Sequence, residues 1–410
     1  MKNGKKWLLG AAALLLGVLS GCGNKNKITM WTPLTGEDGG VMDQMVEEYN
    51  DTDPEFPVEH VVSPDLYTQI YTVMSTGEGT PDLSIIHADR VAGFERQGML
   101  EPLDDIMTTH SDLNQDNYIE QAWEVGNVDG DQYAIPLDIH SNVLYYNKDL
   151  LEKYDATSFL DDDVLTIDEI MSLSGKLDEG DYAINNSLIS WVLLGLVVDL
   201  GGDISDEEGN PTINTPEMEE AMQALVDIQE EGLMTPNGED GYAMFQGNQV
   251  LFSSDGTWSS LAFDQVEDLN YGVTNIYSFD PDNFHNRSSA HVFAMLDNDE
   301  RTDEKEQGIA DFLTWVRENS ITWAEAGQIP ASREVFESPE FDDHQQSFFT
   351  SSQEELDSLH IFMYEHYGYV EAAINTVIND VLYGEMSVED GLQAAQSEVE
   401  DLIAEGYAGE

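Results

Sequence analysis

The sequence predicts an α/β protein of two lobes, each built on a mostly parallel β-sheet flanked by helices. From residue 27 onward, strand-like apolar runs alternate with helix-like amphipathic runs, which is the pattern of parallel βαβ units. Once a leader at the start is set aside, roughly 385 of the 410 residues remain, which is more than one compact core usually holds. Two domains are therefore expected, and no internal repeat or low-complexity linker marks a boundary between them.

Residues 1–21 have the features of a secretory signal in the right order. Three lysines are followed by a short apolar stretch (8–19) and by two small residues, and Cys22 comes next. An apolar run of about a dozen residues is too short to span a hydrocarbon layer of roughly 30 Å. The tetrapeptide LSGC resembles a bacterial lipobox, which implies cleavage before Cys22 and attachment of a diacylglycerol to its sulfur.

We therefore expect a signal peptide at 1–21, a lipidated linker at 22–26 and Cys22 as the lipid attachment site. The alternative is an ordinary signal with an unmodified cysteine near its cleavage site. Two or three acyl chains hold a soluble domain at a membrane, because each buried methylene contributes roughly 0.8 kcal/mol. Cys22 is the only cysteine, so no thiol remains for a disulfide or a nucleophile.

Acidic residues dominate the composition. There are 82 Asp and Glu against 15 Lys and Arg, a formal net charge of −67, and loss of residues 1–21, with three lysines and no acids, takes it to −70. Such a chain repels itself unless counterions screen it, and the Debye length falls from about 10 Å at 0.1 M salt to about 3 Å at 1 M. We expect a protein adapted to concentrated salt outside the cytoplasm, without a nucleic-acid partner. A mildly acidic secreted protein from ordinary medium is the alternative.

The first elements are expected in the order strand, helix, strand, helix, strand. The predicted strands are 27–34, 57–62 and 81–89, and the predicted helices are 40–51 and 65–77. In a parallel sheet the loops at the carboxyl ends of the strands line the ligand crevice, which draws attention to Trp31, His87 and Asp89.

The last element is expected to be a helix that begins near Ser387. Ser387 can cap it, with Asp390 in the capping-box position, where Glu or Gln is usual. An apolar stripe follows at Val388, Leu392, Val399 and Leu402. This spacing indicates a structural role.

Six segments carry a resemblance to a known family. They are ITMWTPLTGEDGGVMDQMVEEYND, PDLSIIHADRVAGFERQGMLEPLDD, YAIPLDIHSNVLYYNKDLLEKY, FQGNQVLFSSDGTW, WAEAGQIPASREVFESPEF and INTVINDVLYGEMSVEDGLQAAQSEVEDLI. In this order they resemble the extracellular solute-binding proteins of carbohydrate ABC transporters, the maltose-binding-protein-like family, over most of residues 27–408. The hexapeptide YYNKDL is the most specific short signature.

The resemblance implies a type II periplasmic-binding-protein-like fold, with the ligand in the cleft between two lobes that close by a hinge motion. Lobe 1 is expected at 27–138 plus 288–338, and lobe 2 at 139–287 plus 339–410. The implied function is that of a monomeric, lipid-anchored receptor on the extracellular face of the membrane. It would capture a sugar, expected to be an oligosaccharide, and pass it to the permease subunits of an ABC transporter. Such a protein is not an enzyme and needs no cofactor.

Aromatic residues are the first candidates for ligand contacts. A sugar ring has an apolar C–H face and a rim of hydroxyls, which suit flat aromatic rings and planar polar groups. Trp258, after SSDGT, corresponds to a tryptophan that in this family often lies against a sugar ring. Trp31 and Trp191 are further candidate platforms, and burial in the core is the alternative for each of the three. Tyr369 is the candidate among the tyrosines of 364–369, a region that brings an aromatic side chain to the site in the family.

Polar candidates lie at strand ends. Asp89 and Arg90 align with an Asp-Arg pair that contacts sugar hydroxyls in the family, and a carboxylate makes strong charge-assisted hydrogen bonds. His87 can donate from a ring nitrogen or satisfy a strand end. Asp138 and His140 lie at the crossover into the second lobe. Near the position of His140 the family has a glutamate in its maltose-binding member, which this chain lacks. That difference leaves the identity of the sugar open.

Several other functions and ligands are alternatives to sugar binding. A glycosidase needs two carboxylates roughly 5 to 9.5 Å apart, which a chain so rich in acids can neither show nor exclude. A zinc site is not expected, because no two of the nine histidines have metal-binding spacing on one helix. The acidic segment DISDEEGN (203–210) lacks the ligand pattern of an EF-hand and is expected to be a solvated turn. A peptide, polyamine or metal complex on the same scaffold, and a structural surface protein that condenses cations, are the remaining alternatives.

Overall fold

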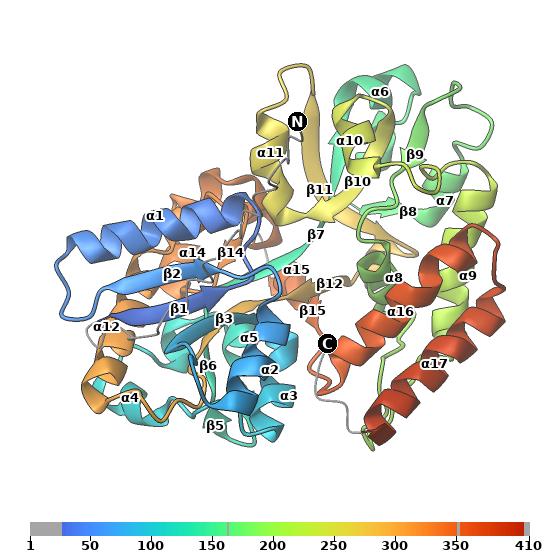
Figure 1. Ribbon diagram of the computed structural model, residues 1–410. Coiled ribbons are helices and arrows are strands. Elements are labelled where there is room, and N and C mark those ends of the chain that lie inside the picture. The colour runs from blue at the N-terminus through green and yellow to red at the C-terminus, as the bar shows by residue number, and fades with distance from the viewer. Residues whose placement is uncertain (1–26, 162–163, 351–352, 406–410) are drawn as a thin grey trace, which may run out of the picture.

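The structure is a computed structural model that describes residues 27–161, 164–350 and 353–405. The expected signal peptide, the linker at 22–26 and Cys22 lie outside the described residues. Figure 1 shows two halves side by side, each with its own β-sheet and surrounding helices. No helix within the described part of the chain is both long and apolar enough to cross a membrane.

The first half is built on a five-stranded sheet with the order β2-β1-β3-β13-β6. The strands are β1 (Ile28–Thr32), β2 (Val58–Val62), β3 (Leu83–His87), β6 (Ala134–Pro136) and β13 (His291–Ala294). β1 pairs in parallel with both β2 and β3, whereas β13 runs antiparallel to β3 and to β6. The predicted strand-helix alternation is confirmed for β1, β2 and β3, and α1 (Glu37–Asp51) and α2 (Leu66–Thr76) are its helices. The sheet as a whole is mixed and not mostly parallel as predicted, because β13 enters it from a distant part of the chain in the antiparallel direction.

The second half is built on a sheet with the order β15-β12-β7-β10-β9, to which β8, β11 and β14 add at the side. Its strands are β7 (Asp138–Asn147), β8 (Val164–Thr166), β9 (Tyr182–Ile184), β10 (Val250–Gly256), β11 (Tyr271–Ser278), β12 (Asn286–Ser289), β14 (Ile329–Pro330) and β15 (Leu359–Ile361). A small hairpin of β4 (Asn127–Val128) and β5 (Asp131–Gln132) stands apart. β7 is the central strand, and β10, β11, β12 and β14 all pair with it in the antiparallel direction. This sheet is therefore also mixed and not mostly parallel as predicted.

The remaining helices cover these sheets. They are α3 (Val91–Arg96), α4 (Asp104–Thr109), α5 (Glu120–Glu124), α6 (Lys148–Lys153), α7 (Ile167–Met171), α8 (Ile189–Asp199), α9 (Pro216–Glu230), α10 (Gly241–Gln246), α11 (Ser260–Asp264), α12 (Asp303–Asn319), α13 (Ile321–Ala324), α14 (Arg333–Phe336), α15 (Gln353–Asp357), α16 (Tyr367–Leu382) and α17 (Val388–Glu405). Of these, α8 is apolar on every side, and nearly all of its residues are buried.

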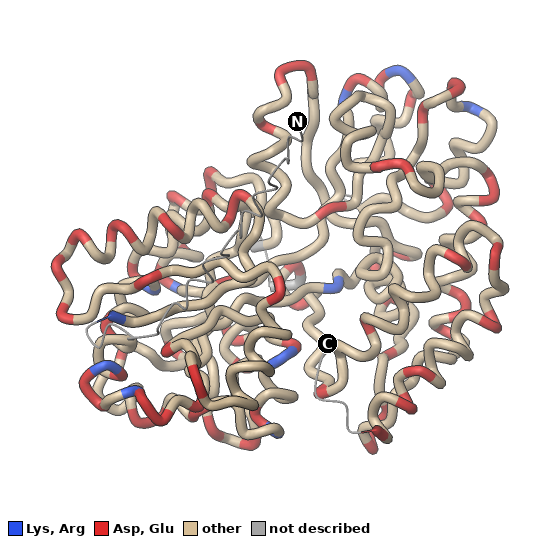
Figure 2. The backbone as a smooth tube through the Cα atoms, viewed as in Figure 1, with Lys and Arg blue, Asp and Glu red and all other residues tan. Residues whose placement is uncertain are grey.

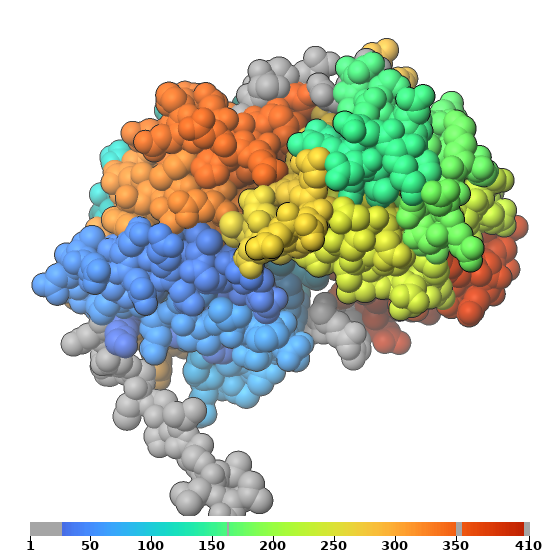
Figure 3. Space-filling view, turned by 90° about the horizontal axis from the view of Figure 1, so that it is seen from above, coloured from blue at the N-terminus to red at the C-terminus, as the bar shows by residue number. Residues whose placement is uncertain are grey.

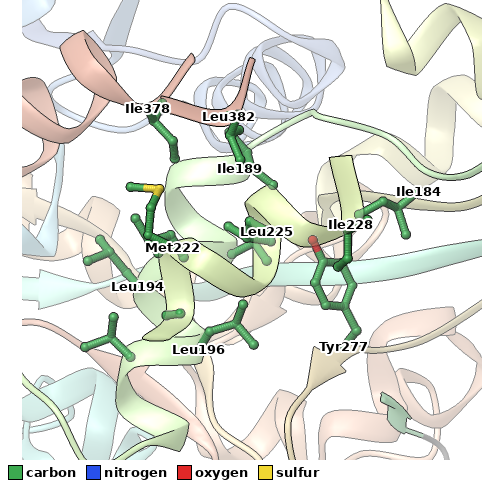
Figure 4. Close-up of a cluster of buried hydrophobic side chains, with 14 of the residues drawn as sticks. Ile184, Ile189, Leu194, Leu196, Met222, Leu225, Ile228, Tyr277, Ile378 and Leu382 are labelled. Atoms are coloured by element: carbon green, nitrogen blue, oxygen red, sulfur yellow. The ribbon is translucent and has the colours of Figure 1, made fainter. Parts of the chain in front are cut away.

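The core of the second half lies between α8, α9 and α16. Figure 4 shows Leu194 and Leu196 of α8 facing Met222 and Leu225 of α9. α17 packs on α9 and α16, with Leu392 and Val399 of the predicted stripe buried. This packing confirms the structural role expected of the last helix.

The chain passes between the sheets more than once. It leaves the first sheet after β6, enters the second through β7, returns at β13, and pairs with β7 again at β14. The passage from β12 to β13 takes a single residue, Ala290, which is fully buried. The loops at the edges of both sheets are thereby held near one another. The lobe limits expected from the sequence stay a prediction.

Candidate functional site

A cavity of about 290 Å³ lies where segments from both sheets meet. Its walls are Pro33, Leu34, Thr35, Gly36 and Asp38 from the β1–α1 connection, His87 and His291 from the first sheet, His140 from β7, and Trp191, Trp258 and Gln328. Figure 3 shows the N-terminal segment, in blue, beside the yellow segment around residue 260, so the two halves touch on this face. A cavity walled by both halves can enclose a small solute.

Trp258 is partly buried and lines this cavity. It follows β10 in a short 3₁₀ turn, and its ring lies back over Gly256, where an added Cβ would come within 2.1 Å of ring atoms. Gly256 is therefore required for the close approach of the ring, although its backbone conformation suits any residue. Trp191, in the first turn of α8, meets Trp258 edge to face, with ring centroids 6.1 Å apart.

Trp191 has a different environment, because a buried arginine covers it. The guanidinium of Arg287 lies 3.3 Å from the ring centroid of Trp191, a cation–π contact. The indole N–H of Trp191 donates to Glu371 at 3.0 Å. The Tyr367 hydroxyl accepts from Arg287. Arg287 thus covers one face of Trp191, and the hydrogen bond to Glu371 fixes the orientation of the ring.

Asp89 and Arg90 belong to the same charged network, beside the cavity. Arg90 contacts Asp89 at 3.1 Å and Glu371 at 3.7 Å, and Arg287 contacts Asp89 at 3.7 Å. Arg90 also lies over the ring of Tyr67, 4.8 Å from its centroid. Each buried cation is balanced by a carboxylate, which is the condition for keeping it in a protein interior.

The floor of the cavity is made of three histidines. His291 is the register partner of His87 across β13 and β3, and its ring centroid lies 5.0 Å from that of His87 and 4.2 Å from that of His140. Asp138 lies beneath them, fully buried, and accepts hydrogen bonds from His140 at 3.1 Å and from His291 at 2.8 Å. Asp138 and His140 share one face of β7 because alternate residues of a strand point the same way.

Burial and mutual charge perturb these groups. Burial, together with the neighbouring histidines, lowers the pKa of His87 well below its ordinary value. Burial also lowers the pKa of His140 to about 4, because it outweighs the opposing effect of Asp138. For His291, burial is outweighed by the Asp138 carboxylate, and the pKa is raised. Burial would raise the pKa of Asp138, yet the histidine charges and hydrogen bonds hold it below its ordinary value.

The structure brings together only part of the predicted site. Four of the predicted ligand contacts line the cavity: His87, His140, Trp191 and Trp258. Asp89, Arg90 and Asp138 do not line the cavity, and each contacts other side chains. Trp31 packs against the cluster of buried apolar residues beside β3, and Tyr369 stacks on His366 with ring centroids 5.6 Å apart. Ligand contact by each of the predicted residues stays a prediction.

Sequence reasoning missed several cavity residues. His291 begins β13, and Gln328 precedes β14. A signal for His291 existed, since HVFA (291–294) is a short apolar run that starts with a histidine. Its proximity to His87 depends on pairing across about 200 residues, which local patterns do not reveal.

The comparisons with known proteins agree with this architecture. The model of the family described as bacterial extracellular solute-binding protein matches residues 44–350. The chain belongs to this family. Membership makes the chain a binding protein and not an enzyme, of a family that works outside the cytoplasm.

Individual relatives are distant but cover nearly the whole chain. An arabinooligosaccharide-binding protein of Halalkalibacterium halodurans is 24% identical, over 91% of this chain and 89% of the relative. An ABC substrate-binding protein of Listeria monocytogenes in complex with cycloalternan has a TM-score of 0.79 at 18% identity, over 92% of this chain and 99% of the other. Maltose-bound MalE3 of T. maritima has a TM-score of 0.75 at 22% identity, over 92% and 99%. The two-lobed type II fold is confirmed.

Proposed function

We propose that this protein captures an oligosaccharide in the cavity between its lobes and delivers it to the permease subunits of an ABC transporter. In this proposal it works as a monomer, anchored through lipid on Cys22 at the extracellular face of the membrane, in a salt-rich environment. Closure of the lobes, with the limits expected from the sequence, encloses the sugar.

The place of Trp258 in the cavity wall is the observation that carries the proposal. Its ring packs against Gly256 and lines the cavity, where an indole suits the apolar face of a sugar ring. Asp38 and Gln328 supply acceptors and donors for hydroxyls on the same walls. An apolar platform with a few polar groups around it favours a sugar over a highly charged solute.

The relatives support a sugar as the ligand class. The names of the relative from Halalkalibacterium halodurans and of the structures described above refer to arabinooligosaccharide, cycloalternan and maltose. The three names refer to different carbohydrates. They favour the class and leave the particular sugar to experiment.

The proposal is tested by titrating the full-length protein with arabino-, malto- and cyclic oligosaccharides in molar NaCl. We expect one class to shift the tryptophan fluorescence saturably and to raise the unfolding midpoint, because a ligand that binds only the folded state stabilises it. Trp258→Ala should weaken the affinity by about 10- to 100-fold, since burial of an aromatic face is worth about 1.5–3 kcal/mol. Trp191→Ala should have a smaller effect, because Arg287 already covers that ring.

The matched control is Trp315→Ala, a tryptophan of α12 that packs against Tyr49 away from the cavity. Its affinity should equal that of the wild type. Binding of peptides or polyamines but of no sugar would refute the proposed ligand class, and an unchanged affinity of Trp258→Ala would move the site elsewhere.

A further inference from the structure

The three histidines of the cavity floor form a cluster that the proposed function does not use. His87 ends β3, His291 starts β13 and His140 lies in β7, so three strands supply one imidazole each. One ring nitrogen from each histidine lies within 4.8 Å of the other two. Among the described residues these three are the group of His, Cys, Asp and Glu side chains close enough to hold a metal ion together.

A hydrogen bond fixes the orientation of each ring through Nδ1. Asp138 accepts from Nδ1 of His140 with Oδ1 and from Nδ1 of His291 with Oδ2, and the Tyr67 hydroxyl contacts Nδ1 of His87. A carboxylate only accepts, so the rings of His140 and His291 carry their proton on Nδ1. No hydrogen bond within the described part of the chain engages the Nε2 atoms of the three rings. Nε2 is therefore the nitrogen available to a ligand in each.

We propose that His87, His140 and His291 together bind one divalent transition-metal ion of the Zn²⁺ type through their Nε2 atoms, with a fourth coordination position open to the cavity. Three imidazoles and one open position are a donor set that such ions accept. In a tetrahedral site with bonds of about 2.0–2.1 Å the ligand atoms lie roughly 3.3 Å apart. One ring nitrogen of each histidine lies within 4.8 Å of the other two, so rotations of the rings are needed to bring three Nε2 atoms to that spacing.

The surroundings of the cluster match those of metal-bound histidines. Such histidines usually donate their other ring N–H to a carboxylate, which orients the ring and raises its basicity. Asp138 does this for two rings at once, and it is itself held by the indole N–H of Trp323 at 2.6 Å and the backbone N–H of His291 at 2.9 Å. The side chain of Asp138 is thus fixed before any ion arrives.

Charge balance favours a cation at the same place. The Asp138 carboxylate is fully buried, and its direct side-chain partners are His140, His291 and Trp323. A buried negative charge is stabilised by a positive charge close by, which a proton on His291, whose pKa is raised, supplies without an ion and which an ion on the three imidazoles would supply in its place. The nearby cation of Arg287 is already opposed by Asp89 and Glu371.

The fourth position faces the same cavity as Trp191 and Trp258. Water fills it when the cavity is empty, and an oxygen of the bound solute replaces that water when the solute is a good ligand for the ion. The metal site itself does not depend on the solute being a sugar, so its test needs no solute.

The test is a calorimetric titration of the chelator-treated, full-length, untagged protein with Zn²⁺ alone. Molar NaCl and an excess of Mg²⁺ occupy the surface carboxylates, which prefer hard cations. We expect one equivalent of Zn²⁺ to bind, and His140→Gln and His87→Gln each to weaken binding by about 100-fold or more. The matched control is His110→Gln, a histidine whose Nε2 contacts Asp311 at 2.9 Å far from the cavity, and it should bind as the wild type does.

A second measurement decides the matter even if the cavity variants fail to fold. Co²⁺ bound by the wild type to three nitrogens in a tetrahedral site gives intense visible absorption, whereas Co²⁺ on surface carboxylates gives only the weak bands of octahedral oxygen ligation. Intense bands that Zn²⁺ abolishes at one equivalent support the site. The proposal is overturned by weak bands alone, by the absence of one-equivalent binding, or by equal affinity of His140→Gln and the wild type.

Discussion

At the scale of single residues, Asp199 is the clearest case of a charge held in an unfavourable place. It is 7% exposed at the end of α8, where it accepts from the hydroxyl of Ser278 and from the backbone N–H of His285, both at 2.6 Å. Burial raises the pKa of this carboxyl to about 7, although the hydrogen bonds act in the opposite direction. Its protonated form is the one that the folded state prefers.

The stability should therefore depend on pH through Asp199. The pKa of Asp199 is higher in the folded than in the unfolded state. Its protonation therefore adds to the free energy of unfolding in full below pH ~4, and this addition is lost as the pH rises to about 7. In urea unfolding, the free energy of unfolding of the wild type minus that of Asp199→Asn should fall by about 2 to 3 kcal/mol from pH 5 to pH 8. Glu220→Gln, on the exposed side of α9, is the control, and a constant difference for Asp199→Asn would contradict the argument.

The close approach of the Trp258 ring to Gly256 leads to a second prediction for a single residue. Gly256→Ala places a methyl group against the ring of Trp258 without straining the backbone, so the ring must move while the strand remains. The affinity for the ligand should fall at least about tenfold with the unfolding midpoint nearly unchanged, as measured by the same fluorescence titration. Gly40→Ala, in the interior of α1 with open space around it, is the matched control and should raise the stability by about 0.5–1 kcal/mol.

At the scale of elements, the first turn of α17 is held by Ser387. Its hydroxyl accepts from the backbone N–H of Asp390 at 3.1 Å and donates to the carboxylate of the same residue at 2.8 Å. The expected cap is confirmed. The carboxylate of Asp390, one methylene shorter than that of Glu, binds the capping hydroxyl and forms a variant of the capping box.

Ser387→Ala should lower the free energy of unfolding by about 1 kcal/mol, because one backbone N–H of the first turn then loses its partner. Urea unfolding monitored by circular dichroism measures this change. Ser397→Ala, in the exposed middle of the same helix, should be neutral or slightly stabilising. Equal effects of the two substitutions would show that the cap contributes nothing.

Sequence patterns located the first five elements to within a few residues, because each depends on contacts along the chain. The helical spacing of Met42, Met45 and Val46 is that of a buried face, and all three are buried in α1. Trp31 shows where this reasoning stops. Its position at the carboxyl end of β1 is as predicted, but its ring packs on the apolar cluster beside β3 because the direction of a side chain depends on the neighbouring strands and helices.

The cavity floor illustrates the same limit. DIH at 138–140 indicated a crossover, and IIH at 85–87 indicated a strand end, yet neither indicates that the two histidines meet. They meet because β13 inserts beside β3 and brings His291 between them. A search for metal-ligand spacing within one helix could not detect a cluster assembled from three strands.

At the scale of the whole molecule, the distribution of charge is the dominant feature. Figure 2 shows acidic residues spread over both halves and few basic ones. Several of the basic residues are buried or partly buried and already paired, such as Arg301 with Glu101 and Lys305 with Asp82. The surface therefore has fewer cations to offset its carboxylates than the composition alone suggests.

Salt should control the stability of the whole molecule. Dilution of NaCl from molar to millimolar concentration lengthens the Debye screening distance from about 3 Å to beyond 10 Å and restores repulsion among the carboxylates. The unfolding midpoint, measured by differential scanning fluorimetry, should fall sharply. A neutral osmolyte such as sucrose should not replace the salt, and a midpoint independent of NaCl would refute adaptation to salt.

The place of β13 also affects the order in which the protein can be completed during its synthesis. β13 lies between β3 and β6, and the backbone N–H of His291 reaches Asp138 across 153 positions of sequence. A ribosome that has produced the first 138 residues has thus made four strands of the first sheet without the one that joins β3 to β6. The first lobe cannot finish folding until most of the second has been translated, so this chain cannot fold one domain at a time.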